Sequence, residues 1–524
     1  MRAPCDGVIQ PGVEGSPCVE AAKPWILAAT ILGSSMAFID STVVNVALPA
    51  LQSNFRATLV SVQWVVESYG LFLGALILVG GSLGDLFGRR LIFLAGVTTF
   101  ALASAFCGVA SSIDQLIFAR CIQGVGAALL VPGSLAIISK SFDEKSRGAA
   151  IGTWSGFTAM TTAAGPVLGG WLVEHASWRW VFFINVPVAA VVIAISIWRI
   201  PESRNNSGGS VDWLGAMLAT AGLGGLVFGF VESTDLGWSD PLVVATLPIG
   251  VVCLVGFVVL EARIASPMVP PALFKDASFA GANLLTLFLY SAIGIFFFLF
   301  PMNLIQVQGY SSTATGAAIL PLILLMFLLS RWSGGLVSRY GARVPLIVGP
   351  CIVALGFGFV SMPSAGDQYW ITFFPALVVL GFGMAVTVAP LTTVVMNSVS
   401  QDRVGTASGI NNAVARIAGV LAIAVMGILI VYAFRYRLNE TLARLSLPAA
   451  ALDEIQAHAT KLAGLQAPAG LDPVTRSAIQ GSIRESFLFG FRVVMFVCAS
   501  LALASAACAW NMIPKDRRKL PRSA

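Results

Sequence analysis

Long apolar runs, separated by short polar segments, make up most of the chain. At about 1.5 Å per residue, a helix of roughly 20 apolar residues crosses the hydrocarbon core of a bilayer, which is about 30 Å thick. The hydrophobic pattern therefore predicts an all-α polytopic membrane protein with fourteen transmembrane helices. We expect the spans at residues 25–50, 61–80, 91–110, 113–138, 148–173, 180–198, 212–231, 241–260, 279–304, 313–335, 343–362, 370–392, 405–432 and 487–511.

One short loop pattern occurs twice. The segment 81–90 (GSLGDLFGRR) has a weaker copy at 334–343 (GGLVSRYGAR), an offset of 253 residues. The same offset relates 152–156 (GTWSG) to 405–409 (GTASG). Two matches at one register predict two pseudo-symmetric, parallel six-helix bundles with two helices inserted between them, the plan of a rocking-type transporter.

The expected organisation follows from this repeat and from the polar segments at either end. A polar segment near the C-terminus predicts a long outer loop, part of which we expect to form an amphipathic surface helix. The predicted divisions are a cytoplasmic tail at 1–24, the first bundle at 25–200, two inserted helices at 201–277, the second bundle at 278–511 with its outer loop at 433–486, and a basic tail at 512–524.

Composition and charge fit a lipid environment. Apolar residues form 57% of the chain and charged residues 11%, against roughly 45–50% and 25% in soluble domains. The net charge is +6, and most of the 31 Lys and Arg residues lie in the two tails and in alternate short loops. Positive residues concentrate on the cytoplasmic side, so we expect a plasma (inner) membrane protein with both termini cytoplasmic. This distribution also argues against a nucleic-acid partner.

Three ionisable residues lie inside predicted spans of the first bundle. An ionisable group within a membrane span is costly and is by default a functional candidate. Asp40 lies about 15 Å from the outer end of its helix, Glu67 about 10 Å and Arg120 about 11 Å, counted at the helical rise. These compatible heights predict a shared, water-filled cavity for proton coupling. The alternative for Asp40 is a purely structural ion pair with a buried base.

Other polar residues are candidates for lining that cavity. Asn45, Gln123 and Asn412 are set in otherwise apolar spans, and Arg416 lies near the middle of the predicted helix 405–432. A buried arginine must be paired or hydrated. Arg416 therefore either holds the two halves together or contacts substrate.

The fifth predicted helix is rich in glycine. Small residues four apart share one helical face and let a neighbouring backbone approach closely, and a proline removes a backbone donor and bends the helix. The residues concerned are Gly152, Gly156, Gly165, Pro166, Gly169 and Gly170.

Taken together, these segments resemble those of the fourteen-helix drug:proton antiporters of the major facilitator superfamily. The resemblance rests on 81–90, on Asp40 to Pro49, on Arg120 to Ala128, and on the glycines and Pro166 of the fifth helix. Two residues depart from the family pattern: Leu86 stands where a base is usual, and Thr161 where glycine is usual.

The resemblance implies roles for specific residues. In the outward-open state, Asp85 is expected to face the helix N-terminus near Gly405 and close an inner gate, where the helix dipole favours negative charge. The other inner-gate residues would be Gly81, Gly88, Arg89 and Arg90. Asp40 would carry the proton, with Glu67 as a second carrier or as a group that recognises cations.

The expected function is export of amphipathic or lipophilic compounds by proton antiport. Proton-coupled uptake of a nutrient or metabolite remains the transporter alternative, and a membrane enzyme or a receptor is the alternative of a different class. Enzyme chemistry is not expected, because the two histidines, His175 and His458, lie in predicted outer loops. An ATP-driven pump is not expected either, because the sequence has no phosphate-binding GxxxxGK[ST] loop. We expect a monomer in the lipid bilayer whose partners are protons and a small-molecule substrate, with no cofactor and no metal.

Overall fold

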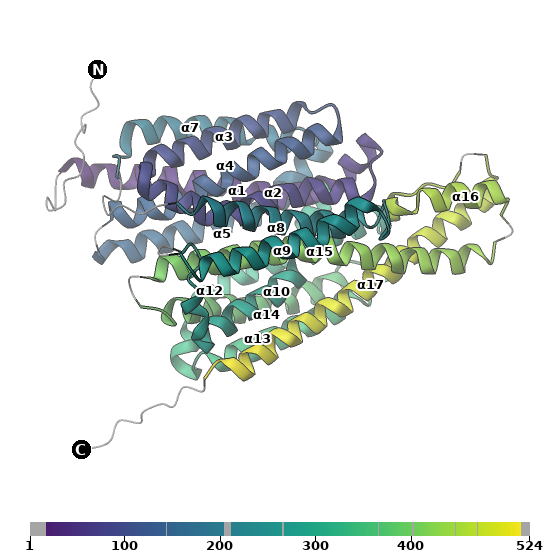
Figure 1. The fold of residues 1–524 in the computed structure, drawn as a ribbon. Coiled ribbons are helices and arrows are strands. Elements are labelled where there is room, and N and C mark those ends of the chain that lie inside the picture. Colours follow the sequence, from purple (N-terminus) through teal and green to yellow (C-terminus); the bar gives the residue numbers. More distant parts are fainter. Residues whose placement is uncertain are drawn as a thin grey trace, which may run out of the picture.

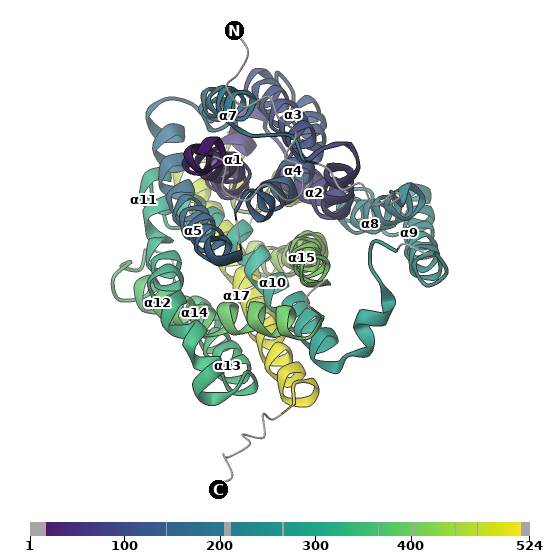
Figure 2. The same cartoon turned by 90° about the vertical axis from the view of Figure 1, so that its left-hand side faces the viewer.

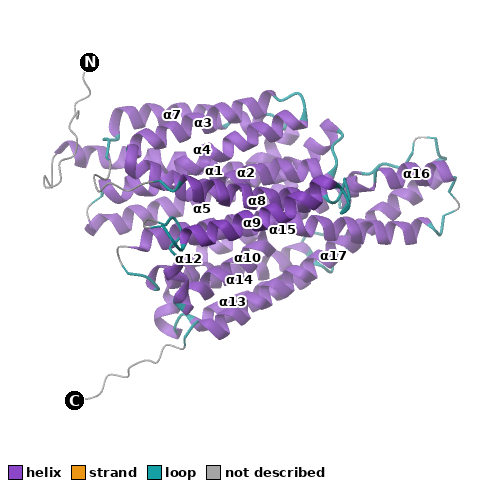
Figure 3. Cartoon of the chain, viewed as in Figure 1, coloured by secondary structure: helices purple, strands orange, loops and turns teal. Residues whose placement is uncertain are grey.

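The described part of the chain is helical. The computed structural model describes residues 17–142, 144–203, 211–264, 267–364, 366–400, 403–445, 447–468 and 470–514, and no strand occurs among them (Figure 3). Thirteen of its helices are long and apolar enough to cross a membrane. The prediction of an all-α membrane protein is confirmed. The helix at the fifth predicted span is not among the thirteen, so the count of fourteen stays a prediction.

The helices are named in chain order. They are α1 Pro17–Phe55, α2 Leu59–Phe87, α3 Arg89–Val109, α4 Ile113–Ser141, α5 Glu144–His175, α6 Trp180–Phe183, α7 Asn185–Arg199, α8 Trp213–Glu232, α9 Pro241–Glu261, α10 Ala277–Met302, α11 Ser312–Ala318, α12 Leu320–Tyr340, α13 Arg343–Val360, α14 Phe373–Asn397, α15 Val404–Leu442, α16 Ala449–Ala457 and α17 Pro473–Met512. A π-helical turn, Asn303–Val307, follows α10, and a 3-10 turn, Ala459–Gly464, follows α16.

Two groups of helices pack side by side. In the first, α2 and α3 pack on α4, and α1 packs on α5; in the second, α12 and α13 pack on α14, and α10 packs on α15 and α17. The helix bounds follow the repeat found in the sequence: α2 shifted by 253 residues spans 312–340, the extent of α11 and α12 together. The helix ends thus carry the same repeat as the loop motifs.

The groups meet through α5 with α11, α2 with α15, and α1 with α10. Helices α8 and α9 pair with each other at the edge of the molecule, and α8 also touches α2 and α15 (Figure 2). Helix α1 begins and α17 ends at the same side of the molecule (Figure 1). We call this the inner side and the opposite one the outer side.

The segment predicted as a long outer loop, 433–486, is mostly helical. Helices α15 and α17 run for 39 and 40 residues and extend beyond the other helices as a hairpin, which carries α16 (Figure 1). Charged residues pair along its surface: Arg437 bonds Glu440 and Glu485, both at 2.5 Å. Apolar residues of the hairpin, among them Leu438 and Ile479, are buried. Because charged residues interrupt the apolar ones along this segment, its sequence resembles that of a polar loop.

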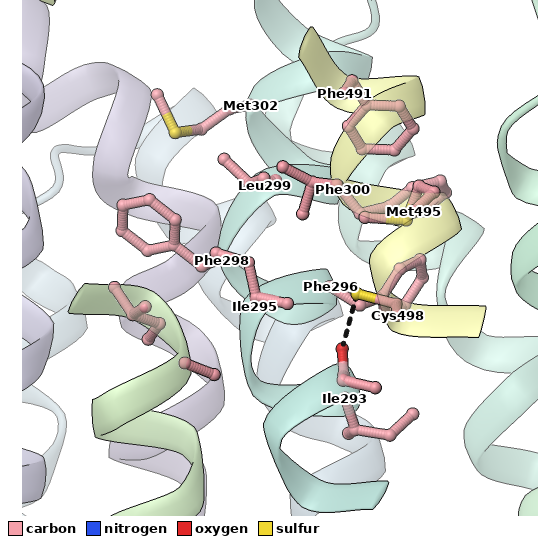
Figure 4. Close-up of a cluster of buried hydrophobic side chains, with 14 of the residues drawn as sticks. Ile293, Ile295, Phe296, Phe298, Leu299, Phe300, Met302, Phe491, Met495 and Cys498 are labelled. Atoms are coloured by element: carbon pink, nitrogen blue, oxygen red, sulfur yellow. Dashed lines mark hydrogen bonds between the residues drawn. The ribbon is translucent and has the colours of Figure 1, made fainter. Parts of the chain in front are cut away.

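The position in the second half that corresponds to Asp40 lies among apolar residues. Helix α10 packs its aromatic and aliphatic residues against α17, with Phe296 and Phe300 stacked at 4.8 Å (Figure 4). The thiol of Cys498 on α17 contacts the Ala292 carbonyl at 3.7 Å. Ile293, which corresponds to Asp40 at the 253-residue offset, belongs to this cluster. The repeat therefore duplicates the arrangement of helices, but Asp40 has no acidic counterpart in the second half.

Candidate functional site

Asp40, Arg120 and Gln123 form a closed polar cluster inside the first half. Asp40 on α1 is fully buried, and its Oδ2 accepts a hydrogen bond from Arg120 Nη1 of α4 at 2.5 Å. Gln123 Nε2, one turn further along α4, donates to Asp40 Oδ1 at 2.8 Å. The same Arg120 nitrogen donates to Gln123 Oε1 at 2.7 Å. Both carboxylate oxygens therefore have a donor, and the pair is electrically neutral.

Helix α2 completes the surroundings of Arg120. The guanidinium Nε donates to the Val65 carbonyl at 3.0 Å, and the guanidinium carbon lies 4.2 Å from the centre of the Tyr69 ring. Small residues allow α2 and α4 to approach this closely: a methyl group placed on Gly124 would lie 2.6 Å from the Tyr69 carbonyl oxygen. Backbone contact at that point brings the Val65 carbonyl and the Tyr69 ring onto the guanidinium.

The cluster can bind or release a proton only if its ion pair changes. Removing one partner of a buried pair leaves an uncompensated charge and costs about 3–5 kcal/mol. Protonation of Asp40 would remove its charge, while Gln123 could still donate to the neutral acid. A movement of α1 relative to α4 would have to break the pair of Asp40 with Arg120.

Glu67 does not join this cluster, contrary to the prediction of one shared site. It is fully buried, and within the described ranges neither of its carboxylate oxygens has a hydrogen-bond partner. It shares a face of α2 with Gln63 and Gly74, which contact α15, whereas Val65 and Tyr69 face α4. Counting residues along a helix gives the depth of a side chain in the membrane but not the side of the helix on which it lies. Glu67 is two residues from Val65 and from Tyr69, so it lies on the opposite side of α2, away from Arg120.

The predicted cavity-lining residues have different environments. Gln123 belongs to the cluster itself. Asn45 is half-buried and donates to the Ser41 carbonyl one turn earlier, at 3.2 Å. Asn412 and Arg416 are half-buried on α15, and the Arg416 guanidinium carbon lies 5.7 Å from the centre of the Phe38 ring on α1.

Aromatic residues around Arg416 were not singled out from the sequence. Phe38 meets Trp154 of α5 edge-to-face at 6.4 Å, and Trp154 Nε1 donates to Ser34 Oγ at 3.1 Å. An apolar span supplies many aromatic residues, so only their position reveals this group.

At the inner loop, Asp85 pairs locally. Its carboxylate accepts from Arg89, four residues on, at 2.8 Å, and its side chain is 48% exposed. Among the described residues Asp85 bonds Arg89 and not α15, and a methyl group placed on Gly405 would meet no described atom within 4 Å. The predicted contact with the N-terminus of α15 is therefore not seen there in this conformation. A methyl group on Gly81 would meet only Pro132, at 3.8 Å.

Gly88 and Arg90 are held by a residue that the sequence analysis did not identify. Gly88 has a φ of 118°, a conformation that favours glycine. The Glu202 carboxylate lies over it and accepts hydrogen bonds from the backbone N–H groups of Arg90 and Leu91, both at 3.1 Å. Arg90 Nη1 in turn donates to the Ile200 carbonyl at 3.0 Å. The separation of more than 100 residues between Glu202 and these donors hid the contact.

The glycines of α5 divide into two sets. A methyl group on Gly165 would lie 2.1 Å from Thr42 Oγ1, and one on Gly169 would lie 3.1 Å from the Val43 backbone, so α1 packs directly on them. Near Gly152 and Gly156, by contrast, such a group would meet no atom of the described residues within 4 Å. The predicted close approach is therefore absent at these two inner positions in this conformation.

At the outer end the halves are in contact. A methyl group on Gly170 would lie 2.2 Å from the Ser312 carbonyl oxygen, and one on Gly316 would lie 2.0 Å from that of Pro166. The Glu174 carboxylate accepts from the backbone N–H of Thr313 at 3.0 Å. The two halves are therefore in contact at the outer end, whereas the expected contact of Asp85 with α15 is not seen at the inner end.

A second outer contact joins the halves through glutamines. Gln306 Nε2 of the π-helical turn donates to Gln52 Oε1 of α1 at 2.8 Å. Gln52 Nε2 donates in turn to the Lys461 carbonyl of the hairpin at 3.2 Å. The hairpin therefore lies against the outer ends of both halves.

Comparisons with known proteins cover nearly the whole chain. A family model described as Major Facilitator Superfamily matches residues 30–423. The multidrug resistance protein Stp of Mycobacterium tuberculosis is 34% identical over 511 residues, covering 94% of this chain and 92% of the relative. The tetracenomycin C resistance and export protein of Streptomyces glaucescens is 32% identical over 492 residues, covering 93% and 91%.

Solved structures agree in fold. An inward-facing, unoccupied bacterial homologue of the human lysosomal transporter Spinster matches with a TM-score of 0.63 at 17% identity, covering 95% of this chain and 98% of that one. The inward-open xylose transporter XylE from E. coli matches with a TM-score of 0.56 at 12% identity, covering 94% and 97%. At these identities the likeness supports the arrangement of helices alone.

Proposed function

Since this chain belongs to the major facilitator superfamily, we propose that it is a secondary active transporter that exports amphipathic drugs or toxic metabolites in exchange for protons. The relatives support the export of drugs, because their names describe multidrug resistance and tetracenomycin C resistance and export. The proposed setting is the plasma membrane, with both termini cytoplasmic and a single copy of the chain as the working unit.

The observation that carries the proton-coupling proposal is the buried pair of Asp40 with Arg120, bridged by Gln123. Asp40 is the proposed proton carrier. Arg120 and Gln123 occupy both carboxylate oxygens while α1 and α4 are in contact, and separation of the two helices would free Asp40 to exchange a proton. Alternating access would supply that movement, because the two halves rock about their boundary.

The proton gradient supplies enough energy for this work. One proton moving through 100 mV releases about 2.3 kcal/mol, and each pH unit adds about 1.36 kcal/mol. The electrical term alone supports a roughly fiftyfold gradient of a neutral solute at one proton per molecule, since a tenfold ratio corresponds to about 1.4 kcal/mol.

The test is substrate-driven proton movement in inverted membrane vesicles. Addition of a transported dye to acidified vesicles should release protons from the lumen, and Asp40→Asn should abolish this release at unchanged expression, because an amide cannot carry the proton. Asp114→Asn is the matched control: Asp114 is an exposed acid in the first turn of α4, and its loss should leave transport intact. Full proton release in the Asp40 variant would reject the role of Asp40, and proton movement together with the dye would indicate symport.

A further inference from the structure

Arg416 is a membrane-embedded cation without an anion. It lies about 18 Å from the start of α15, counted at the helical rise. Within the part of the chain that the structure describes, its guanidinium makes no hydrogen bond and no ion pair, and its Nε is buried without a partner. A buried unpaired charge is costly, and intramembrane ionisable residues mark sites of function.

The acids of the interior do not compensate this charge. Asp40 is fully occupied by Arg120 and Gln123. Glu67 makes no hydrogen bond to Arg416, because both of its carboxylate oxygens are buried without a partner among the described residues. The interior of the described chain therefore presents one free positive charge at the boundary between the halves.

Aromatic side chains of the first half lie beside that charge. Phe38 of α1 lies 5.7 Å from the guanidinium carbon, and Trp154 of α5 meets the Phe38 ring. Trp154 is held in place by its bond to Ser34. Fixed rings beside a guanidinium form a surface that suits a flat ring carrying a negative group.

We propose that Arg416 is the specificity-determining residue for substrate and that the compounds it selects are planar aromatic acids bound as anions. The guanidinium offers planar donors that match a carboxylate or a phenolate, and Phe38 and Trp154 contact the ring of the ligand. This assignment rests on the proposed function and deepens it. The anion and the proton bind different groups, Arg416 and Asp40, so one site does not exclude the other.

The experiment uses three probes with one ring system. Anthracenecarboxylate, its methyl ester and the corresponding trimethylammonium compound are titrated into the purified full-length protein in lipid nanodiscs, with calorimetric detection. The carboxylate should bind about ten- to hundredfold more tightly than the ester, the range that hydrogen bonds to a charged group supply. Arg416→Gln should bring that ratio close to one, and Arg416→Lys should retain part of it.

Two further variants separate the possible failures. Arg492→Gln also removes a positive charge from the second half, but Arg492 already donates to the Ser361 and Pro363 carbonyls, so the carboxylate preference should persist. Asp40→Asn should keep that preference in binding while losing proton-driven transport. An unchanged ratio in Arg416→Gln, tighter binding of the trimethylammonium probe, or binding of none of the three overturns the assignment. Absence of proton coupling in the wild-type protein would overturn the proposed function and leave the assignment standing.

Discussion

At the level of single residues, the sequence predicts the depth of a side chain in the membrane and its chemical type, but not the neighbour that it faces. Asp40 and Arg120 were expected at compatible depths, and the structure brings them to 2.5 Å. Glu67 was expected at the same depth and nevertheless faces α15. Helical depth follows from counting residues, whereas the direction of a side chain depends on which neighbour packs against each face. Gln123 was expected to line a cavity and instead links Asp40 to Arg120.

The isolation of Glu67 leads to a stability prediction. A buried polar group without a partner costs about 1–3 kcal/mol, so Glu67→Leu should raise the midpoint of thermal unfolding above that of the wild type. Glu67→Gln, which keeps a polar group at the same place, should not. Unfolding of the purified variants in one detergent, followed by loss of the monodisperse peak in size-exclusion chromatography, measures both. A fall in stability for the leucine variant would mean that Glu67 has a partner in the folded protein.

At the level of helices, the sequence predicts positions well where lipid sets the pattern. The repeat register reappears in the bounds of α2 and of α11 with α12, because both copies must cross the same thickness of membrane. Outside the membrane the apolar pattern weakens, and the outer ends of α15 and α17 were missed. Their charged faces are stabilised by pairs such as Arg444 with Glu440 at 2.8 Å, which a search for apolar spans does not detect.

The connection between α2 and α3 allows a test at this level. Gly88→Ala places a side chain at a φ of 118°, which costs on the order of 1–3 kcal/mol. It also puts the new methyl group 2.7 Å from the Glu202 carboxylate, which then loses the backbone donors of Arg90 and Leu91. We expect the midpoint of thermal unfolding of this variant to be lower than that of the wild type, because the contacts of the loop between α2 and α3 are weakened.

Gly405→Ala is the matched control for that change. It makes the same substitution in α15, where the new methyl group meets no atom within 4 Å, and alanine is favoured over glycine in a helix by about 0.4–1 kcal/mol. Its thermal midpoint should equal or exceed that of the wild type. Equal losses in both variants would show that the inner loop does not depend on the conformation of Gly88.

At the level of the whole molecule, the two ends are in different states. Contacts join the halves at the outer end, at Gly170 and Gly316, while a methyl group on Gly152 or Gly405 at the inner end would meet nothing within 4 Å. The sequence predicts residues for an inner gate, but it cannot predict which state is seen. One chain must adopt both arrangements, and they differ by only a few kcal/mol. Gly170 and Gly316 therefore allow close packing when the outer end is closed, whereas we expect Gly152 and Gly405 to do so when the inner end is closed.

This asymmetry predicts opposite effects for two carboxylates. Glu174 accepts from the Thr313 N–H only while the outer end is closed, whereas Asp85 is free to meet the N-terminus of α15 only when the inner end closes. Asp85→Asn should therefore lower the outward-facing population, by about two- to fivefold for a dipole interaction of about 0.3–1 kcal/mol. Glu174→Gln should raise it.

The outward-facing population can be followed by labelling one cysteine. In a variant with the native cysteines replaced, Ser312→Cys lies against Gly170 and should react with a membrane-impermeant maleimide only while the outer end is open. The labelling rate on intact cells then scales with the outward-facing population, even when that population is small. Asp85→Asn should slow the reaction and Glu174→Gln should speed it, while Asp114→Asn leaves it unchanged. A shift in the same direction for both variants would contradict the division of the two carboxylates between the two states.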